Sequence, residues 1–200
     1  MKLVLTMLSS LILVLPAAAS GYWGGVIGVY SDPAAIDCMV SDTPGLRTVY
    51  AIQKFNLGST SSRFRIELSP GFTGTLAAVS SPYSISGDPL TGMTVDYNGA
   101  CLLGSYGIVD LQFLFFGTSP ECSWIRAAPH PLSVDGKLDT YDCAFARHPA
   151  DWAGTHVQYN LWGWCPDYSE GEGHGPRCLP YTPPLAVEPS TWGAVKALYR

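Results

Sequence analysis

Residues 63–68 read Arg-Phe-Arg-Ile-Glu-Leu, and this stretch decides the fold class. Three apolar residues alternate with three charged ones, so Phe64, Ile66 and Leu68 would point to one face of an extended strand. A two-residue period of this kind is typical of an antiparallel strand with one buried and one solvated face. The stretch therefore predicts a β-strand whose apolar side faces a core.

The same period recurs on both sides of this strand. Residues 108–116 form the most apolar run, in which Asp110 and Gln112 lie on the face opposite to four alternating hydrophobic residues. Residues 47–55 alternate as well. Shorter candidate strands cover residues 26–30, 75–79, 93–97, 123–127, 137–141 and 157–162. Turn signals such as Asn98-Gly99 and Asp135-Gly136 separate them.

Eight or nine short strands with this spacing predict an all-β fold, an antiparallel β-sandwich of immunoglobulin-like outline. No helical period of useful length lies between the strands, which argues against a parallel βαβ sheet. The 12% aromatic residues suit two facing sheets with a core roughly 10 Å thick.

Composition excludes several classes of protein. Only 14% of the 200 residues are charged and the formal net charge is −5. A coiled coil needs heptads rich in charged residues, and a disordered chain combines low hydrophobicity with high net charge. Nucleic-acid binding needs clustered Lys and Arg. We therefore expect a globular protein that does not bind nucleic acid.

The N-terminus has the pattern of a signal peptide over residues 1–19. Lys2 precedes an apolar run over residues 3–15, and Ala17-Ala18-Ala19 offers a cleavage site. The run is shorter than the roughly 20 residues of a membrane-spanning helix. We predict cleavage near Ala19 and a mature chain, without a transmembrane segment, that is secreted or at the cell surface, in the periplasm or outside the cell.

The mature chain divides into three parts by composition. Residues 20–143 are predicted to form the sandwich core, and residues 144–180 an aromatic, Gly-rich and disulfide-stapled extension of the same domain. Residues 181–200 would form a Pro-rich linker and a short C-terminal amphipathic helix. The segment 192–200 is open to three interpretations: a helix packed on its own domain, a tail that meets a partner, or disorder.

All six cysteines lie in the mature part, and an even number in an exported chain predicts disulfides. Sequence alone does not choose the pairing. The preferred set follows sequence order: Cys38–Cys101, Cys122–Cys143 and Cys165–Cys178. A zinc site is the alternative, formed by Cys165, His174 and Cys178 with Cys143 or His148.

Candidate binding residues come from the aromatic segment after residue 150. Exposed indole and phenol rings suit protein interfaces and stacking on sugars. The candidates are Trp152, Tyr159, Trp162, Trp164 and Tyr168. The alternative interpretation is a hydrophobic lid on the sandwich, in which the same rings are buried.

No nucleophile-elbow, metalloprotease, phosphate-binding or dinucleotide motif occurs, so we assign no catalytic residue and expect neither a cofactor nor a bound metal. A small secreted hydrolase is an alternative, using a histidine between residues 130 and 174 with Asp135, Asp139 or Asp167. The acidic loop 167–172 is a candidate site for Ca²⁺, which its carboxylates could bind.

The Cys and Gly framework resembles that of a group of uncharacterised exported bacterial proteins. The residues that carry the resemblance are Gly28-Val29-Tyr30, Cys38, Pro44-Gly45-Leu46, Ser62-Arg63-Phe64, Gly92, Tyr97, Cys101, Gly117-Thr118-Ser119, Cys122, Cys143 and the tail 192–199. The resemblance implies no activity. In outline the domain is also similar to immunoglobulin-like and cohesin-like extracellular modules. A true immunoglobulin domain has a Trp between its two cysteines, whereas no Trp lies between Cys38 and Cys101.

These observations together predict an exported, non-catalytic β-sandwich that binds or assembles at or outside the cell surface. The expected partner is an extracellular protein or glycan. The alternatives are a carbohydrate-binding module that uses the Trp152–Tyr168 aromatics and the small hydrolase described above.

Overall fold

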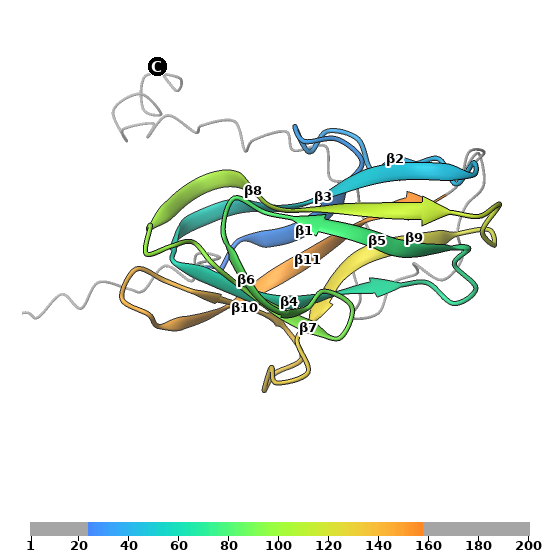
Figure 1. The fold of residues 1–200 in the computed structure, drawn as a ribbon. Coiled ribbons are helices and arrows are strands. Elements are labelled where there is room, and N and C mark those ends of the chain that lie inside the picture. Colours follow the sequence, from blue (N-terminus) through green and yellow to red (C-terminus); the bar gives the residue numbers. More distant parts are fainter. Residues whose placement is uncertain (1–23, 158–200) are drawn as a thin grey trace, which may run out of the picture.

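The structure is a computed structural model that describes residues 24–157. Eleven strands and no helix lie within this range. The strands are β1 (Val26–Tyr30), β2 (Met39–Val40), β3 (Gly45–Ser59), β4 (Ser61–Leu68), β5 (Gly74–Ser80), β6 (Ser84–Asp88), β7 (Gly92–Asp96), β8 (Leu102–Phe115), β9 (Ser123–Pro129), β10 (Leu138–Tyr141) and β11 (Arg147–Val157). They stack as two layers of a β-sandwich (Figure 1). The predicted all-β sandwich is confirmed.

One layer has the strand order β5–β8–β3–β1, and the other contains β6–β7–β4 with β10 and β9 along the far side of β4. Strand β11 joins the layers, because it pairs with β1 in one and with β10, β9 and β2 in the other. Most pairings are antiparallel as predicted. The pairings of β11 with β1 and with β2 are parallel.

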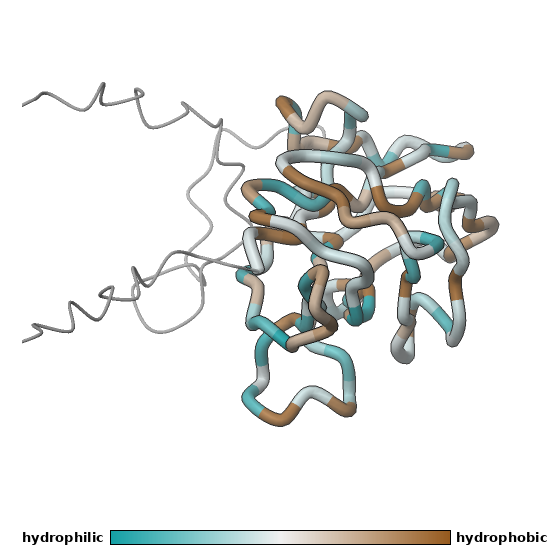
Figure 2. Tube along the Cα trace, turned by 90° about the vertical axis from the view of Figure 1, so that its left-hand side faces the viewer, coloured by the Kyte–Doolittle hydropathy of each residue, from teal (hydrophilic) through white to brown (hydrophobic). Residues whose placement is uncertain are grey.

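The apolar faces predicted from sequence form the core. Phe64 and Ile66 of β4 are fully buried, as are the alternating residues Val109, Leu111, Phe113 and Phe115 of β8. Figure 2 shows hydrophobic positions along the layered strands and also at the tips of peripheral loops. Alternation thus identified which side of β4 and of β8 faces inward.

Strand β11 lies within the predicted aromatic, Gly-rich extension, where no strand was predicted before residue 157. Its first half contains Pro149, which interrupts the apolar alternation and cannot donate a backbone hydrogen bond. The strand tolerates this proline at a position paired with Asp139 of β10. Of the candidate strand 157–162, only Val157 is among the described residues.

Several predicted features lie outside the described residues. They are the signal peptide, the chain beyond residue 157, the Pro-rich linker and the C-terminal helix. Between residues 24 and 157, no helix has the length and hydropathy to cross a membrane.

Candidate interaction surface at the Cys101–Cys143 disulfide

Cys101 is bonded to Cys143, with their Cα atoms 5.4 Å apart. The predicted pairs Cys38–Cys101 and Cys122–Cys143 are therefore wrong. Cys38 and Cys122 are also disulfide-bonded. The predicted pair Cys165–Cys178 lies outside the described residues.

The sheet register explains why sequence order gave the wrong pairs. Strands β7 and β10 flank β4 on opposite sides, and both end beside Thr60. The Tyr97 amide donates to the Thr60 carbonyl and the Thr60 amide donates to the Tyr141 carbonyl, each at 2.8 Å. Cys101 and Cys143 follow these two strand ends, so the turns that carry them meet although 42 residues separate them.

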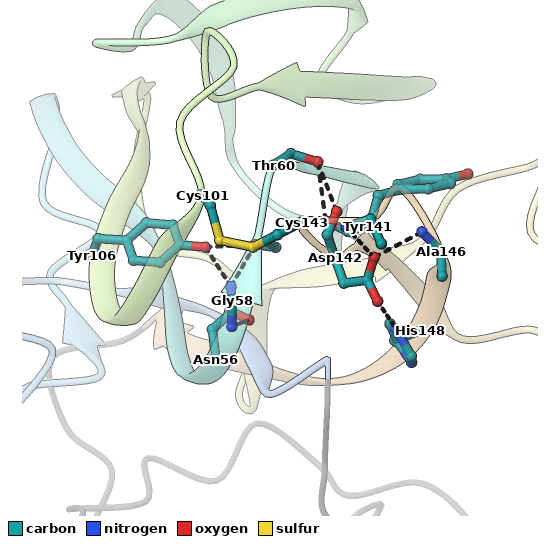
Figure 3. The surroundings of a disulfide bond; sticks show 12 residues. Asn56, Gly58, Thr60, Cys101, Tyr106, Tyr141, Asp142, Cys143, Ala146 and His148 are labelled. Carbon is teal, nitrogen blue, oxygen red and sulfur yellow. Dashed lines mark hydrogen bonds and ion pairs between the residues drawn. A yellow bond between two sulfur atoms is a disulfide. The ribbon is translucent and has the colours of Figure 1, made fainter.

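Gly58 provides the space in which the disulfide lies (Figure 3). A Cβ atom at this position would be 3.0 Å from the Cys143 sulfur and 3.3 Å from the Cys101 sulfur. The Gly58 φ of 133° also lies in a region that side chains disfavour. A larger residue here would have to displace the disulfide or the strand.

A buried polar network holds the β3 end beneath the disulfide. Asn56 accepts a hydrogen bond from the Gly58 amide at 2.9 Å, and its side-chain amide donates to the Tyr106 hydroxyl at 2.5 Å. Ser59 bonds to the same hydroxyl at 2.7 Å. Burial raises the pKa of Tyr106. This end of the sandwich is therefore held in one conformation by bonds from both β3 and β8.

The carboxylate of Asp142 organises the β10–β11 hairpin turn that carries Cys143 (Figure 3). Its Oδ1 accepts from the Ala144 and Ala146 amides, each at 2.8 Å, and its Oδ2 lies 2.9 Å from the His148 Nε2. The His148 hydrogen bond, followed by the backbone amides, lowers the pKa of Asp142. The Phe145 amide donates to the Asp142 carbonyl at 2.9 Å. The turn therefore has a fixed shape.

This turn holds Phe145 in an unfavourable conformation at the surface. Its φ is 64°, in the left-handed region where glycine is preferred in such hairpin turns, and its side chain is 75% exposed. Leu57 and Leu103 are 56% and 69% exposed, and a Leu103 methyl lies beside Gly58 and the two sulfurs. We call Leu57, Leu103 and Phe145 the disulfide-end patch, because each lies on one of the three segments that meet at this disulfide.

Asp135 and Asp139, the two described carboxylates considered for hydrolysis, form an ion-pair network with arginines. Asp139 is fully buried and accepts from Arg63 at 2.6 and 2.9 Å and from Arg147 at 2.5 Å. Asp135 accepts from Arg147 at 2.6 Å, which lowers the pKa of Asp135. The contacts of these two carboxylates give them a structural role in joining β4, β10 and β11.

Three of the histidines considered for that reaction are described, and two of them, His130 and His148, have structural partners given by hydrogen bonds. His130 Nδ1 accepts from the Leu132 amide at 3.1 Å, and burial followed by the nearby Arg63 charge lowers the pKa of His130. His148 bonds to Asp142 as described above. Cys143, a possible fourth ligand of the alternative zinc site, is oxidised in a disulfide and is not available as a thiolate.

Trp152 is the one predicted binding residue that the structure describes. It is half-buried and packs against the core, and the Arg126 guanidinium lies 4.6 Å from its ring and 4.1 Å from the Trp124 ring. It thus forms part of a stack with Arg126. The predicted binding residues Tyr159, Trp162, Trp164 and Tyr168, the zinc ligands Cys165, His174 and Cys178, and the acidic residues 167–172 lie outside the described residues.

Sequence analysis missed the disulfide-end patch. Leu57, Leu103 and Phe145 are isolated apolar residues that match no periodic pattern. Only the hairpin geometry reveals that Phe145 occupies a position suited to glycine. The sequence did contain one indication, because Leu103 and Phe145 each follow one of the two cysteines by two residues. This indication could be used only once Cys101 was known to bond to Cys143.

Comparisons with known proteins find solved structures of similar outline but no matching family. No family model matches the chain, and no curated protein matches its sequence. A cohesin module from a family 33 glycoside hydrolase of Clostridium perfringens matches at 10% identity and a TM-score of 0.49, covering 67% of this chain and 96% of that module.

Two further cohesins have a similar outline. The non-cellulosomal cohesin of Archaeoglobus fulgidus matches at 6% identity and a TM-score of 0.45, covering 67% of this chain and 91% of its own. A type II cohesin domain from the cellulosome of Acetivibrio cellulolyticus matches at 12% identity and a TM-score of 0.44, covering 66% and 94%. These values say nothing of what this chain binds.

Proposed function

We propose that the protein is an exported, non-catalytic β-sandwich module that binds a protein partner through the disulfide-end patch. The observation that carries this proposal is Phe145, which is both strained and exposed. The left-handed conformation costs a residue with a side chain about 1–2 kcal/mol relative to its usual conformations. Backbone strain of this kind is concentrated at functional sites.

The chemistry of the patch suits a protein interface. Aromatic residues at the centre of an interface contribute much of its binding energy, and they do so best on a rigid support. The turn that carries Phe145 is held by four hydrogen bonds, and Asp142 is one of the two partners in each of them. Leu57 and Leu103 are exposed on the other two segments that meet at this disulfide, and we assign them to the same interface.

Two further observations support export and a non-catalytic role. No cysteine among the described residues is free, and disulfides persist mainly in oxidising compartments outside the cytosol. Asp135 and Asp139, two of the three carboxylates considered for a hydrolase, form ion pairs with Arg63 and Arg147. The conformation of these side chains is thereby explained by folding alone.

Site-specific photo-cross-linking in the native host tests the proposal. A benzophenone amino acid is placed at position 145, and at position 134 as the control. Val134 is 88% exposed but lies in the loop before β10. We expect a discrete cross-linked protein from position 145 that position 134 does not give. No adduct at 145, or the same adducts at both positions, would contradict the proposal.

A further inference from the structure

Cys38 and Cys122 lie at the opposite end of the sandwich from the disulfide-end patch. Cys38 directly precedes β2 and Cys122 directly precedes β9. Both strands pair with the last residues of β11, whereas the hairpin of Cys143 precedes its first residue. Both cysteines are disulfide-bonded, and Cys101 and Cys143 already bond to each other.

The register places Cys38 and Cys122 on different sides of β11. His156 of β11 pairs with Met39 of β2 and also with Trp124 of β9. A strand residue has one neighbouring strand on each side, so β2 and β9 must flank β11. Adjacent strands are about 4.8 Å apart, which puts β2 and β9 roughly 9–10 Å apart.

The two cysteines are also offset along the strand direction. Because β2 runs parallel to β11, Cys38 lies level with Thr155, and its carbonyl accepts from the His156 amide at 2.7 Å. Ser123 pairs with Val157, so Cys122 lies one step beyond it. The offset is three residues, or about 10 Å at 3.3 Å per residue.

These separations combine to roughly 14 Å between the two Cα atoms. A disulfide requires Cα atoms within about 7 Å of each other. Cys38 therefore cannot bond to Cys122. The chain has six cysteines, and Cys165 and Cys178 are the two that remain.

We propose that Cys38 and Cys122 bond to Cys165 and Cys178, one each, and that two disulfides thereby link β2 and β9 to the chain after Val157. This arrangement replaces the predicted Cys165–Cys178 pair. Each bond joins two thiols, with loss of two protons and of two electrons to a disulfide oxidant of the thiol–disulfide oxidoreductase class.

The chain is long enough for this arrangement. Eight residue steps separate Val157 from Cys165, and an extended chain of that length reaches about 26 Å. The inference is independent of the proposed function, because it concerns the end of the sandwich remote from Phe145.

Peptide mapping of the mature, non-reduced protein tests the connectivity. Cleavage with trypsin and a glutamate-specific protease leaves each cysteine on its own peptide, because Glu121 separates Cys101 from Cys122 and Arg177 separates Cys165 from Cys178. We expect the Cys38 and Cys122 peptides to be linked to the Cys165 and Cys178 peptides. A Cys165–Cys178 linkage, or free thiols at these positions, would overturn the proposal.

Thiol counting in a double variant gives a second, independent readout. In Cys165→Ser/Cys178→Ser, two thiols should become reactive to an alkylating reagent, at Cys38 and Cys122. The matched control Cys101→Ser/Cys143→Ser should gain none, since it removes both partners of one known bond. No alkylation of the first variant would mean that Cys165 and Cys178 pair with each other.

Discussion

At the scale of single residues, Phe145 combines an unfavourable backbone conformation with little burial to compensate for it. Replacing it with glycine should relieve the left-handed strain and lose few contacts, because the side chain is mostly exposed. We expect Phe145→Gly to raise the free energy of unfolding by about 1 kcal/mol, as measured by urea denaturation.

Ala144 supplies the matched control for that prediction. It is exposed in the same turn, but its φ is not positive, so glycine brings no relief there. Ala144→Gly should lower stability by up to about 1 kcal/mol. A Phe145→Gly variant less stable than the natural protein would show that Phe145 stabilises the fold, and the argument from strain would fail.

Asp139 presents the opposite case, a buried charge that the fold depends on. Arg63 and Arg147 both donate to it, so its replacement would leave two arginines without their anion. We expect Asp139→Asn to destabilise the protein by about 3–5 kcal/mol, as for other broken buried ion pairs. The more exposed Asp135→Asn should cost less than about 1 kcal/mol. Equal effects in urea denaturation would argue against this distinction.

At the scale of elements, the β10–β11 hairpin should show a defined pH dependence. Folding lowers the pKa of Asp142, chiefly through the hydrogen bond from His148, whereas the pKa of an unfolded aspartate is about 3.9. The stabilisation is therefore complete above about pH 4 and is lost as the pH falls through the lower folded-state pKa.

The variant Asp142→Asn isolates this contribution, because asparagine keeps an oxygen for the turn amides but has no charge for His148. The natural protein should have a higher Tm than the variant at pH 7, and the difference should shrink at pH 3. Thermal unfolding followed by circular dichroism at the two pH values measures it. A difference that is the same at both would exclude the charge of the Asp142 carboxylate as its source.

The Cys101–Cys143 disulfide is the element that joins the β7–β8 turn to the β10–β11 turn. It closes a loop of 42 residues. Its removal should lower the free energy of unfolding by about 2–4 kcal/mol, mainly because the unfolded chain gains conformational entropy. Cys101→Ser/Cys143→Ser should show this loss in urea denaturation. A loss well under about 1 kcal/mol would mean that the sheet register alone holds the two turns together.

A strand could be predicted from the sequence where one of its faces is buried and the other is exposed, because its apolar and polar residues then alternate. The apolar faces of β4 and β8 follow from alternation, and the Asn98-Gly99 turn follows from residues that adopt positive φ. Strand β11 escaped because it bridges two sheets and pairs on both sides, so no simple period marks it.

At the scale of the whole molecule, the sequence could predict a sandwich but not the order of its strands. Which turns meet depends on strand order, and strand order depends on contacts between distant residues. Cys101 meets Cys143 only because β7 and β10 both flank β4. The same dependence hid the candidate site, since Leu57, Leu103 and Phe145 are adjacent to one disulfide only after the sandwich closes.

The central claim is that Phe145 anchors a protein partner, and its affinity for the partner identified by cross-linking tests this most directly. Titration calorimetry should show at least a tenfold loss of affinity for Phe145→Gly relative to the natural protein, because an aromatic anchor contributes about 2 kcal/mol or more. Val134→Ser, exposed elsewhere, should bind unchanged. Unchanged affinity of Phe145→Gly would contradict the account.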